Sequence, residues 1–168
     1  MIIKKSDKGI TSLCFGGQIS KGSLRMDAVG DLDELMGALG VARALIKEKF
    51  LKDELLEIQK MLIVVSAELA TLKKNLSQIK GRISEKDLEL LDKKISFLNK
   101  KVSLPKCFII PGESLASAQL NLARAIARRS ERKIVRLFEE KQLLNRCLLA
   151  WMNRLSQYLF LLSQCNQH

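Results

Sequence analysis

The sequence contains little proline, few aromatic residues and no obvious cysteine pairs. Its 168 residues include two prolines, and aromatic side chains make up only 5% of a chain that is 47% hydrophobic. Strand-rich domains normally contain more aromatic and β-branched residues, so this composition favours Leu-rich helices and an all-α fold. A chain of this length forms one domain by default and can bury a core without metals or disulfides.

The cysteines and the hydrophobic runs argue against several further classes of protein. Cys14, Cys107, Cys147 and Cys165 are widely spaced and form no Cys-x-x-Cys pair, so neither a disulfide framework nor a zinc site is indicated. No stretch approaches the roughly 18 uncharged apolar residues of a membrane span, and the first residues lack the apolar segment of a signal peptide. We therefore expect a soluble, cytoplasmic protein with reduced thiols, no protein-ligated metal and no membrane partner.

Acidic residues are outnumbered. There are 18 Asp and Glu against 29 Lys and Arg, which gives a formal net charge of +11. An excess of this size favours an anionic partner, such as a nucleotide, a nucleic acid or a membrane surface. Charge alone does not choose among them.

Apolar periodicity predicts five helices after residue 23. The clearest is the second, where the apolar spacing from Leu55 to Leu72 alternates three and four, as in a helix packed almost parallel to its neighbours. The five predicted helices span residues 24–46, 55–72, 84–102, 114–140 and 144–162. A strand would show an apolar period of two, which these segments lack.

The breaks between the predicted helices have their own signals. Ser84 followed by Asp87 resembles a capping box that opens the third helix. Pro105 and Pro111 force the chain out of helical geometry before the fourth helix. Residues 1–23 are polar and rich in glycine and serine, so we expect an extended loop there.

The fourth predicted helix carries a row of arginines. Arg124, Arg128 and Arg132 recur at i, i+4 and i+8 and therefore share one face, which Glu131 joins. A planar guanidinium binds phosphate oxygens in a bidentate manner. We interpret this face as a site for a polyanion, and the alternative is an ordinary solvated surface. The opposite side, expected to face the core, carries Leu115, Leu122, Ile126 and Leu137.

The first predicted helix carries a stripe of Gly30, Asp33, Gly37, Gly40 and Ala44. Each glycine costs up to about 1 kcal/mol relative to alanine in a helix, so we expect another helix or a ligand close to this face. A carboxylate at such a contact needs a partner, and an arginine of the fourth helix is the expected one. The ion pair could organise a site or be purely structural.

The start of the chain, Lys4-Lys-Ser-Asp-Lys-Gly-Ile-Thr-Ser, combines three lysines with three hydroxyl side chains and a glycine. Backbone amides, hydroxyls and ammonium groups in a loop suit a triphosphate. The segment matches neither the Walker phosphate loop nor a dinucleotide fingerprint.

Six short motifs follow one another along almost the whole chain. They are Asp7-Lys-Gly-Ile-Thr-Ser-Leu, Leu24-Arg-Met-Asp-Ala-Val-Gly-Asp-Leu-Asp-Glu-Leu, Glu68-Leu-Ala-Thr, Phe108-Ile-Ile-Pro-Gly, the helix from Arg124 to Arg132, and Asn153-Arg-Leu-Ser. In this order they resemble the motifs of the trimeric helical-bundle ATP:cob(I)alamin adenosyltransferases, also called corrinoid adenosyltransferases.

The resemblance implies a fold and a reaction. The fold is a five-helix up-and-down bundle of the ferritin-like type, a single domain over residues 1–168 in which residues 1–23 form a nucleotide-binding loop. The reaction is transfer of the 5′-deoxyadenosyl group from ATP, with Mg²⁺, to the cobalt of cob(I)alamin, which releases triphosphate. The implied sites lie between the subunits of a homotrimer, and the implied protein partner is a corrinoid reductase or a cobalamin-dependent acceptor enzyme.

The resemblance also implies roles for individual residues. Arg128, Arg132 and Asp33 would be catalytic, because the arginines face the leaving triphosphate and Asp33 pairs with Arg128. Phe108 would bind cobalamin by pressing on the lower face of the corrin ring. The residues implied to bind ATP are Lys4, Lys5, Ser6, Thr11, Ser12, Lys21, Arg128, Glu131, Arg132 and Asn153.

Several positions depart from the pattern of the family. Lys5-Ser6 stands where Thr-Gly or Asn-Gly is usual, and the other departures are Met36 for asparagine, Glu113 for glycine, Asn121 for histidine and Gln157 for aspartate. They leave open a diverged member that binds nucleotide or cobalamin without efficient transfer.

A third reading is a basic helical protein that binds nucleic acid. It explains neither Asp33 among glycines nor the ordered motifs, and aromatic side chains for base stacking are scarce. Nucleic acid is therefore not an expected partner.

Overall fold

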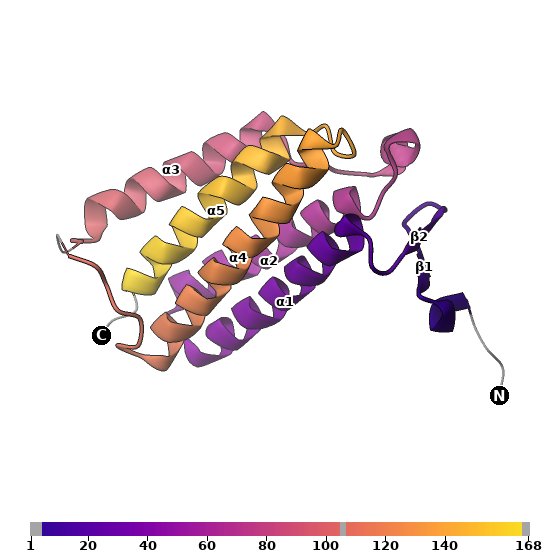
Figure 1. The fold of residues 1–168 in the computed structure, drawn as a ribbon. Helices are drawn as coiled ribbons and strands as arrows, with labels where there is room; N and C mark the ends of the chain where they lie inside the picture. The colour runs from indigo at the N-terminus through magenta and orange to yellow at the C-terminus, as the bar shows by residue number, and fades with distance from the viewer. Residues whose placement is uncertain (1–4, 105–106, 166–168) are drawn as a thin grey trace.

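The chain is an up-and-down bundle of five α-helices (Figure 1), and its computed structural model describes residues 5–104 and 107–165. The helices are α1 (Leu24–Leu45), α2 (Lys49–Leu69), α3 (Glu85–Lys101), α4 (Leu115–Glu139) and α5 (Arg146–Cys165). A short 3-10 helix, η2 (Lys73–Gln78), lies between α2 and α3. The predicted all-α, five-helix class is confirmed.

The helix ends follow from local polar groups. Ser84 and Asp87 form the predicted capping box at the start of α3: the Ser84 N–H donates to Asp87 Oδ2 at 2.9 Å, and the Asp87 N–H donates to Ser84 Oγ. Asn145 caps α5, because its Oδ1 accepts from the N–H groups of Cys147 and Leu148 at 3.0 and 3.3 Å. Helix α5 therefore begins two residues later than the apolar periodicity predicted.

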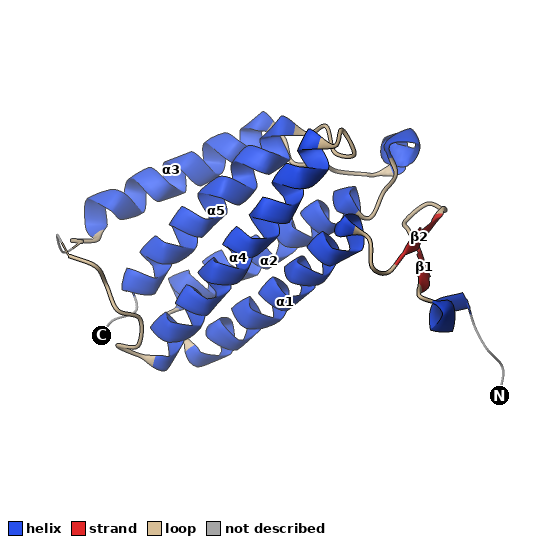
Figure 2. Cartoon of the chain, in the orientation of Figure 1, coloured by secondary structure: helices blue, strands red, loops and turns tan. Residues whose placement is uncertain are grey.

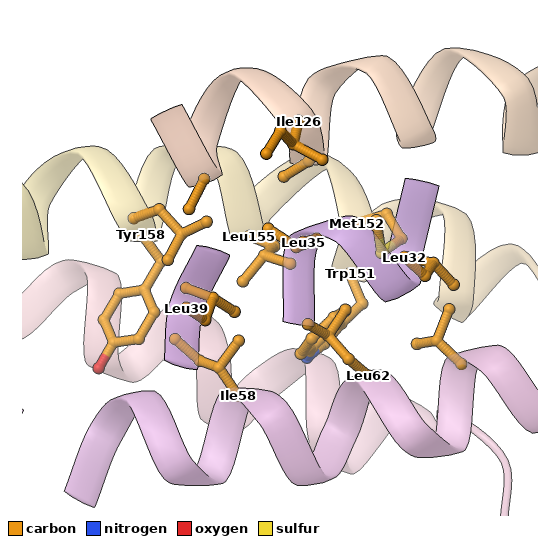
Figure 3. Close-up of a cluster of buried hydrophobic side chains, with 14 of the residues drawn as sticks. Leu32, Leu35, Leu39, Ile58, Leu62, Ile126, Trp151, Met152, Leu155 and Tyr158 are labelled. Carbon is orange, nitrogen blue, oxygen red and sulfur yellow. The ribbon is translucent and has the colours of Figure 1, made fainter. Parts of the chain in front are cut away.

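One continuous core fills the space between the helices. Figure 3 shows its centre, where side chains from α1, α2, α4 and α5 meet. The predicted apolar stripes supply it. The labelled core side chains are Leu32, Leu35, Leu39, Ile58, Leu62, Ile126, Trp151, Met152, Leu155 and Tyr158.

Three apolar residues expected in the core lie at the surface instead. Leu115 is 77% exposed because it is the first residue of α4, and Leu144 is exposed because it lies before α5 begins. Leu122 is 52% exposed, since it lies about 40° further round α4 than the buried Ile126. Helix α4 therefore has an outward apolar edge that periodicity alone assigned to the core.

A polar cluster around the buried Tyr158 lies within the helical body. The hydroxyl of Tyr158, on α5, donates to Glu54 Oε2 of α2 at 2.5 Å, and Lys94 Nζ of α3 lies 2.6 Å from the same oxygen. Burial raises the pKa of Tyr158 above its usual value, and the hydrogen bond to Glu54 raises it further. The cluster joins α2, α3 and α5 through neutral tyrosine and charged partners.

The N-terminal segment is not the featureless loop that its composition predicted. It contains a 3-10 helix, η1 (Lys5–Lys8), and an antiparallel hairpin of β1 (Ile10–Ser12) and β2 (Gln18–Ser20), which projects beyond the start of α1 (Figure 2). The hairpin turn uses Gly16 and Gly17 at φ of 90° and 101°, a conformation that favours glycine. Strands of three residues are too short to show apolar alternation, so periodicity missed them.

The described residues also bear on membrane insertion and on the state of the cysteines. No helix within residues 5–104 or 107–165 has the length and apolar character required to cross a membrane. All four cysteines are free, with Cys14 and Cys107 exposed and Cys147 and Cys165 half-buried.

The packing of α2 predicts a contrast between two adjacent residues. Leu62 is fully buried, whereas Ile63 is 57% exposed. We expect Leu62→Ala to lower the free energy of unfolding by about 2–5 kcal/mol, because it removes buried methyl groups and leaves a cavity. Ile63→Ala is the control and should change it by less than about 1 kcal/mol. Equal losses in urea denaturation of the two variants would contradict this core.

Candidate functional site

Two unpaired cations lie on the outward face of α4. Arg128 and Arg132 are both exposed, and Arg132 Nη1 donates to the Arg128 carbonyl oxygen at 3.1 Å. Among the residues that the structure describes, neither guanidinium forms an ion pair. Arg124, one turn earlier, is half-buried and donates from Nε to Asn121 Oδ1 at 3.3 Å. The row therefore presents two free guanidinium groups, with Arg124 held to the side.

Glu131 and Asn153 lie beside these arginines and touch each other. Asn153 Nδ2, on α5, donates to Glu131 Oε1, on α4, at 2.8 Å. The family resemblance implied a role in nucleotide binding for both residues, and the structure places them together although they lie 22 positions apart. Their pairing leaves a second carboxylate oxygen and an amide oxygen as acceptors next to the cationic face.

The predicted ion pair between Asp33 and Arg128 does not form within one chain. Asp33 is exposed and makes no hydrogen bond or ion pair with any described residue. The carboxylate that faces α4 is Asp31, because two helical residues turn the chain by about 200°. Asp31 is 7% exposed, and its Oδ1 lies 3.2 Å from Arg129 Nε.

The network around Asp31 fastens α1 to α4. Arg129 also bonds Glu34, and Lys133 Nζ lies 3.0 Å from Asp31 Oδ2 and 3.3 Å from Asp27 Oδ2. Desolvation opposes the charged form of Arg129, but Asp31 and Glu34 outweigh it and raise the pKa of Arg129 above its usual value. These are the residues that arginine spacing alone did not single out.

The glycine stripe of α1 faces outward as well. A Cβ placed on Gly30 or Gly37 would meet nothing within 4 Å, whereas one on Gly40 would lie 3.6 Å from Gln59 Nε2 of α2. The neighbouring apolar side chains Val41 and Leu45 are 51% and 43% exposed. The described residues of the chain therefore leave the stripe open at Gly30 and Gly37, and only the side chain of Gln59 approaches it at Gly40.

The N-terminal hairpin carries three of the predicted phosphate-binding residues. Thr11 lies on β1 and is half-buried, whereas Ser12 and Lys21 are exposed. The predicted residue Lys4 lies outside the described residues. Lys5 and Ser6 belong to η1, where the backbone is described but the side chains are not.

Phe108 is completely exposed, at 102% of its reference surface, and Ile110 is 84% exposed. Both belong to the segment before α4, so Phe108 is not the core aromatic that would have been its simplest explanation. This segment lies at the opposite end of the bundle from the N-terminal hairpin (Figure 1). Helix α4 has 25 residues and is about 37 Å long, so the two ends of the bundle are separated by a distance of about this size.

The other positions that depart from the family pattern have ordinary surroundings. Asn121 is buried and donates to Ser163 Oγ at 3.2 Å, so it has a packing role. The carbonyl oxygen of Met36 accepts from Gln59 Nε2 at 3.0 Å, while Glu113 and Gln157 are exposed.

A buried charged cluster lies at the hairpin end of the bundle. Glu68 has no exposed surface, and its Oε1 accepts from Arg82 Nη2 at 2.7 Å and from Arg82 Nε at 3.0 Å. Its Oε2 accepts from Asn145 Nδ2 at 3.0 Å. The cluster fixes the end of α2 to the α2–α3 and α4–α5 connections. Sequence analysis identified Glu68 by its motif but assigned it no partner.

Together these features define a helical-bundle protein with an outward cationic face on α4 and a polar hairpin beyond α1. The cobalamin adenosyltransferase family matches residues 1–165 of the chain. The chain therefore belongs to the cobalamin adenosyltransferase family, as the motifs predicted.

Individual relatives agree over almost the whole chain. A corrinoid adenosyltransferase of Citrobacter freundii is 38% identical over 164 residues, which are 98% of this chain and 93% of the relative. A corrinoid adenosyltransferase of Bacillus subtilis (strain 168) is 34% identical, and the match covers 94% of this chain and 81% of the relative. The chain spans 49% of another relative, the corrinoid adenosyltransferase PduO of Citrobacter freundii.

Solved structures share the fold. A variant of the PduO-type ATP:corrinoid adenosyltransferase from Lactobacillus reuteri, complexed with cobalamin and ATP, superposes with a TM-score of 0.88 at 32% identity. The match covers 99% of this chain and 90% of that chain. A second variant of the same enzyme, complexed with ATP, superposes with a TM-score of 0.87.

Arg128 and Arg129 are adjacent in sequence, yet their surroundings predict different effects on stability. Arg129→Ala removes a partner of the buried Asp31 carboxylate, so we expect the free energy of unfolding to fall by about 1–3 kcal/mol. Arg128→Ala removes no described ion pair and should change it by less than about 0.5 kcal/mol. Urea denaturation at one protein concentration checks both values. A larger loss in Arg128→Ala than in Arg129→Ala would contradict the assignment.

Proposed function

We propose that this chain transfers the 5′-deoxyadenosyl group of ATP to the cobalt of cob(I)alamin and releases adenosylcobalamin and triphosphate. The observation that carries the proposal is the pair of unpaired guanidinium groups, Arg128 and Arg132, next to the hydrogen-bonded Glu131 and Asn153. Membership of the cobalamin adenosyltransferase family supports the same reaction.

No side chain of the protein needs to form a covalent bond in this reaction. Cobalt in the Co(I) state supplies the electron pair of the new bond to C5′ of ATP. The bond from C5′ to the phosphate oxygen breaks, and its electron pair leaves with triphosphate. No general base is needed, so the protein contributes by aligning ATP with cobalt and by stabilising the charge that develops on the leaving oxygen.

Arg128 and Arg132 suit the leaving group. Each guanidinium can donate two parallel hydrogen bonds to phosphate oxygens, and neither has a competing carboxylate among the described residues. Glu131 and Asn153 offer acceptors and an amide donor at the edge of the same face, where they can orient the nucleoside part of ATP.

The N-terminal segment would bind the remaining phosphate oxygens. Lysine ammonium groups and hydroxyls of a hairpin can surround a triphosphate, and Mg²⁺ can enter as its complex with ATP. A Mg²⁺ ion that arrives with ATP is held mainly by phosphate oxygens and water. The residues proposed for this role are Lys4, Lys5, Ser6, Thr11, Ser12 and Lys21.

A site shared between subunits explains the outward features of α1 and α4. The glycine stripe of α1 allows close approach of another chain, and Leu115 and Leu122 give α4 an exposed apolar edge. Packing of these faces in a homotrimer would bring Asp33 of one chain to Arg128 of the next. Asp33 would then fix the guanidinium of Arg128 towards the triphosphate.

Phe108 is proposed to contact the corrin ring. A fully exposed phenylalanine is costly in water and gains free energy by covering an apolar ligand face. Contact with the lower face of the corrin would displace the axial base, and loss of an axial ligand changes the reduction potential of a macrocycle-bound metal.

The reaction also implies a setting for the enzyme. Cob(I)alamin persists only under reducing conditions, and the four free cysteines fit a reducing compartment. We propose a cytoplasmic location, with supply of reduced corrinoid by a reductase or delivery of the product to a cobalamin-dependent acceptor enzyme.

Anaerobic incubation with ATP, Mg²⁺ and chemically reduced cobalamin tests the reaction. Formation of the cobalt–carbon bond is followed by absorbance, and release of triphosphate is measured in parallel. Equal amounts of the two products would support the proposal. Measurable ATP binding without turnover would support the alternative of a diverged family member.

Substitution of Arg128 tests the role of the α4 face. We expect Arg128→Ala to lower kcat about 100-fold or more, because it removes a donor to the developing charge. Asp33→Ala should lower kcat less, by about tenfold, because it releases the same arginine from its partner. The matched control is Lys52→Ala, an exposed cation near the start of α2, which should keep the wild-type rate. A wild-type rate for Arg128→Ala would refute this mechanism.

Substitution of Phe108 separates the corrinoid from ATP. Phe108→Ala should lower kcat/KM for the corrinoid by about tenfold or more and leave KM for ATP within about twofold, since the lost contact is to the corrin alone. Ile110→Ala, also exposed in the same segment, is the control. Neither change should alter the melting temperature. A selective rise in KM for ATP would argue against the assigned role.

A further inference from the structure

The N-terminal hairpin is joined to the bundle by few contacts. The Cys14 N–H donates to the Ala70 carbonyl oxygen at 2.9 Å, and Cys14 forms an isolated bridge with Thr71. Asn75 Nδ2 donates to the Phe15 carbonyl oxygen at 3.0 Å, and Leu13 is buried. The segment just after α2 therefore receives the hairpin.

Arg25 donates hydrogen bonds to the same segment. Its Nη1 donates to the carbonyl oxygens of Leu69 and Thr71, the second at 3.4 Å, which are the residues on either side of Ala70. Its Nη2 donates to the Gln142 carbonyl oxygen in the α4–α5 connection at 2.8 Å. Arg25 thus connects the start of α1 to the end of α2 and to the segment after α4.

Burying the charged side chain of Arg25 costs free energy, because the guanidinium group loses its contact with water. Arg25 is only 3% exposed, and among the described residues its charged group meets carbonyl oxygens and no carboxylate. Burial lowers the pKa of Arg25, which reflects the cost of the buried charge. The C-terminal end of α2 favours a cation, but a well-packed apolar side chain would usually cost less at such a position.

The position of Arg25 in the chain gives it control over the hairpin. It lies in the first turn of α1, five residues after β2 ends at Ser20. The base of the hairpin is closed by the Lys21 N–H, which donates to the Gly9 carbonyl oxygen at 2.8 Å. The hairpin therefore has a covalent joint to α1 and a hydrogen-bonded joint to residues 70–75, and Arg25 connects the two.

We propose that Arg25 is a positioning residue for ATP, which sets the angle of the hairpin against the bundle and thereby places Thr11, Ser12 and Lys21 at the triphosphate. The inference rests on the proposed function of the hairpin in ATP binding. Arg25 itself does not contact ATP and acts through the carbonyl groups that flank the contact between Cys14 and Ala70.

Arg25→Met and Arg25→Lys test the inference in the full-length enzyme. We expect Arg25→Met to raise KM for ATP and the calorimetric Kd for ATP about tenfold. A change of this size corresponds to the loss of one to two hydrogen bonds between the hairpin and ATP. KM for the corrinoid should stay within about twofold. Lysine retains a cation but cannot donate to both flanking carbonyl groups in the same way, so Arg25→Lys should give an intermediate value.

A general loss of stability is excluded by a matched control. Tyr158→Phe removes the buried hydrogen bond to Glu54, which is near the other end of α2 and remote from the hairpin. It should lower the melting temperature and leave both KM values unchanged. If Arg25→Met fails to fold, Asn75→Ala provides an independent test, because it removes only the contact to Phe15 and should raise KM for ATP about threefold.

The outcomes separate this inference from the proposed reaction. Wild-type turnover with a selective rise in KM for ATP in the Arg25 and Asn75 variants supports the positioning role. If the wild-type enzyme turns over but the folded variants have an unchanged KM for ATP, the positioning role is overturned. An equal rise in KM for ATP and KM for the corrinoid also overturns it. Absence of turnover in the wild-type enzyme overturns the proposed reaction instead, and the Kd for ATP still decides the role of Arg25.

Discussion

The contact of Asp31 with Arg129 and Lys133 sets the rotation of α4, and the candidate site depends on that rotation. These three residues lie between α1 and α4, where one carboxylate is nearly buried and both of its partners come from α4. A helix turns about 100° per residue, so fixing Arg129 against α1 directs Arg128 outwards. Turning α4 by one residue would bury Arg128 and leave Asp31 without its partner, and each change is costly.

Helix α4 therefore divides its surface among separate tasks. Ile126 and Leu137 fill the core, Arg129 and Lys133 bind α1, and Glu131 meets Asn153 of α5. The remaining face carries the free guanidinium groups. The arginines proposed to bind the triphosphate are therefore held on a rigid helix without taking part in the packing that fixes it.

The sequence predicted the helices well because their apolar spacing depends on burial by neighbouring helices. It failed where the decisive contact is not periodic. The three-residue strands are too short to show alternation, and spacing alone did not distinguish Asp31 from Asp33 as the partner of α4. Leu122 was assigned to the core because an apolar edge at the surface of one chain has the same spacing as a buried one. Arg25 offered no signal, since its partners are backbone carbonyl groups, which any sequence provides.

The separation of Asp33 from Arg128 within one chain has a genetic consequence. If the two residues meet only between chains, a chain that lacks Asp33 and a chain that lacks Arg128 are defective in complementary halves of the site. Mixed assemblies of the two contain some interfaces at which both residues are intact. Two impaired alleles with defects in different halves would then restore part of the activity when expressed together, whereas two defects in the same half would not.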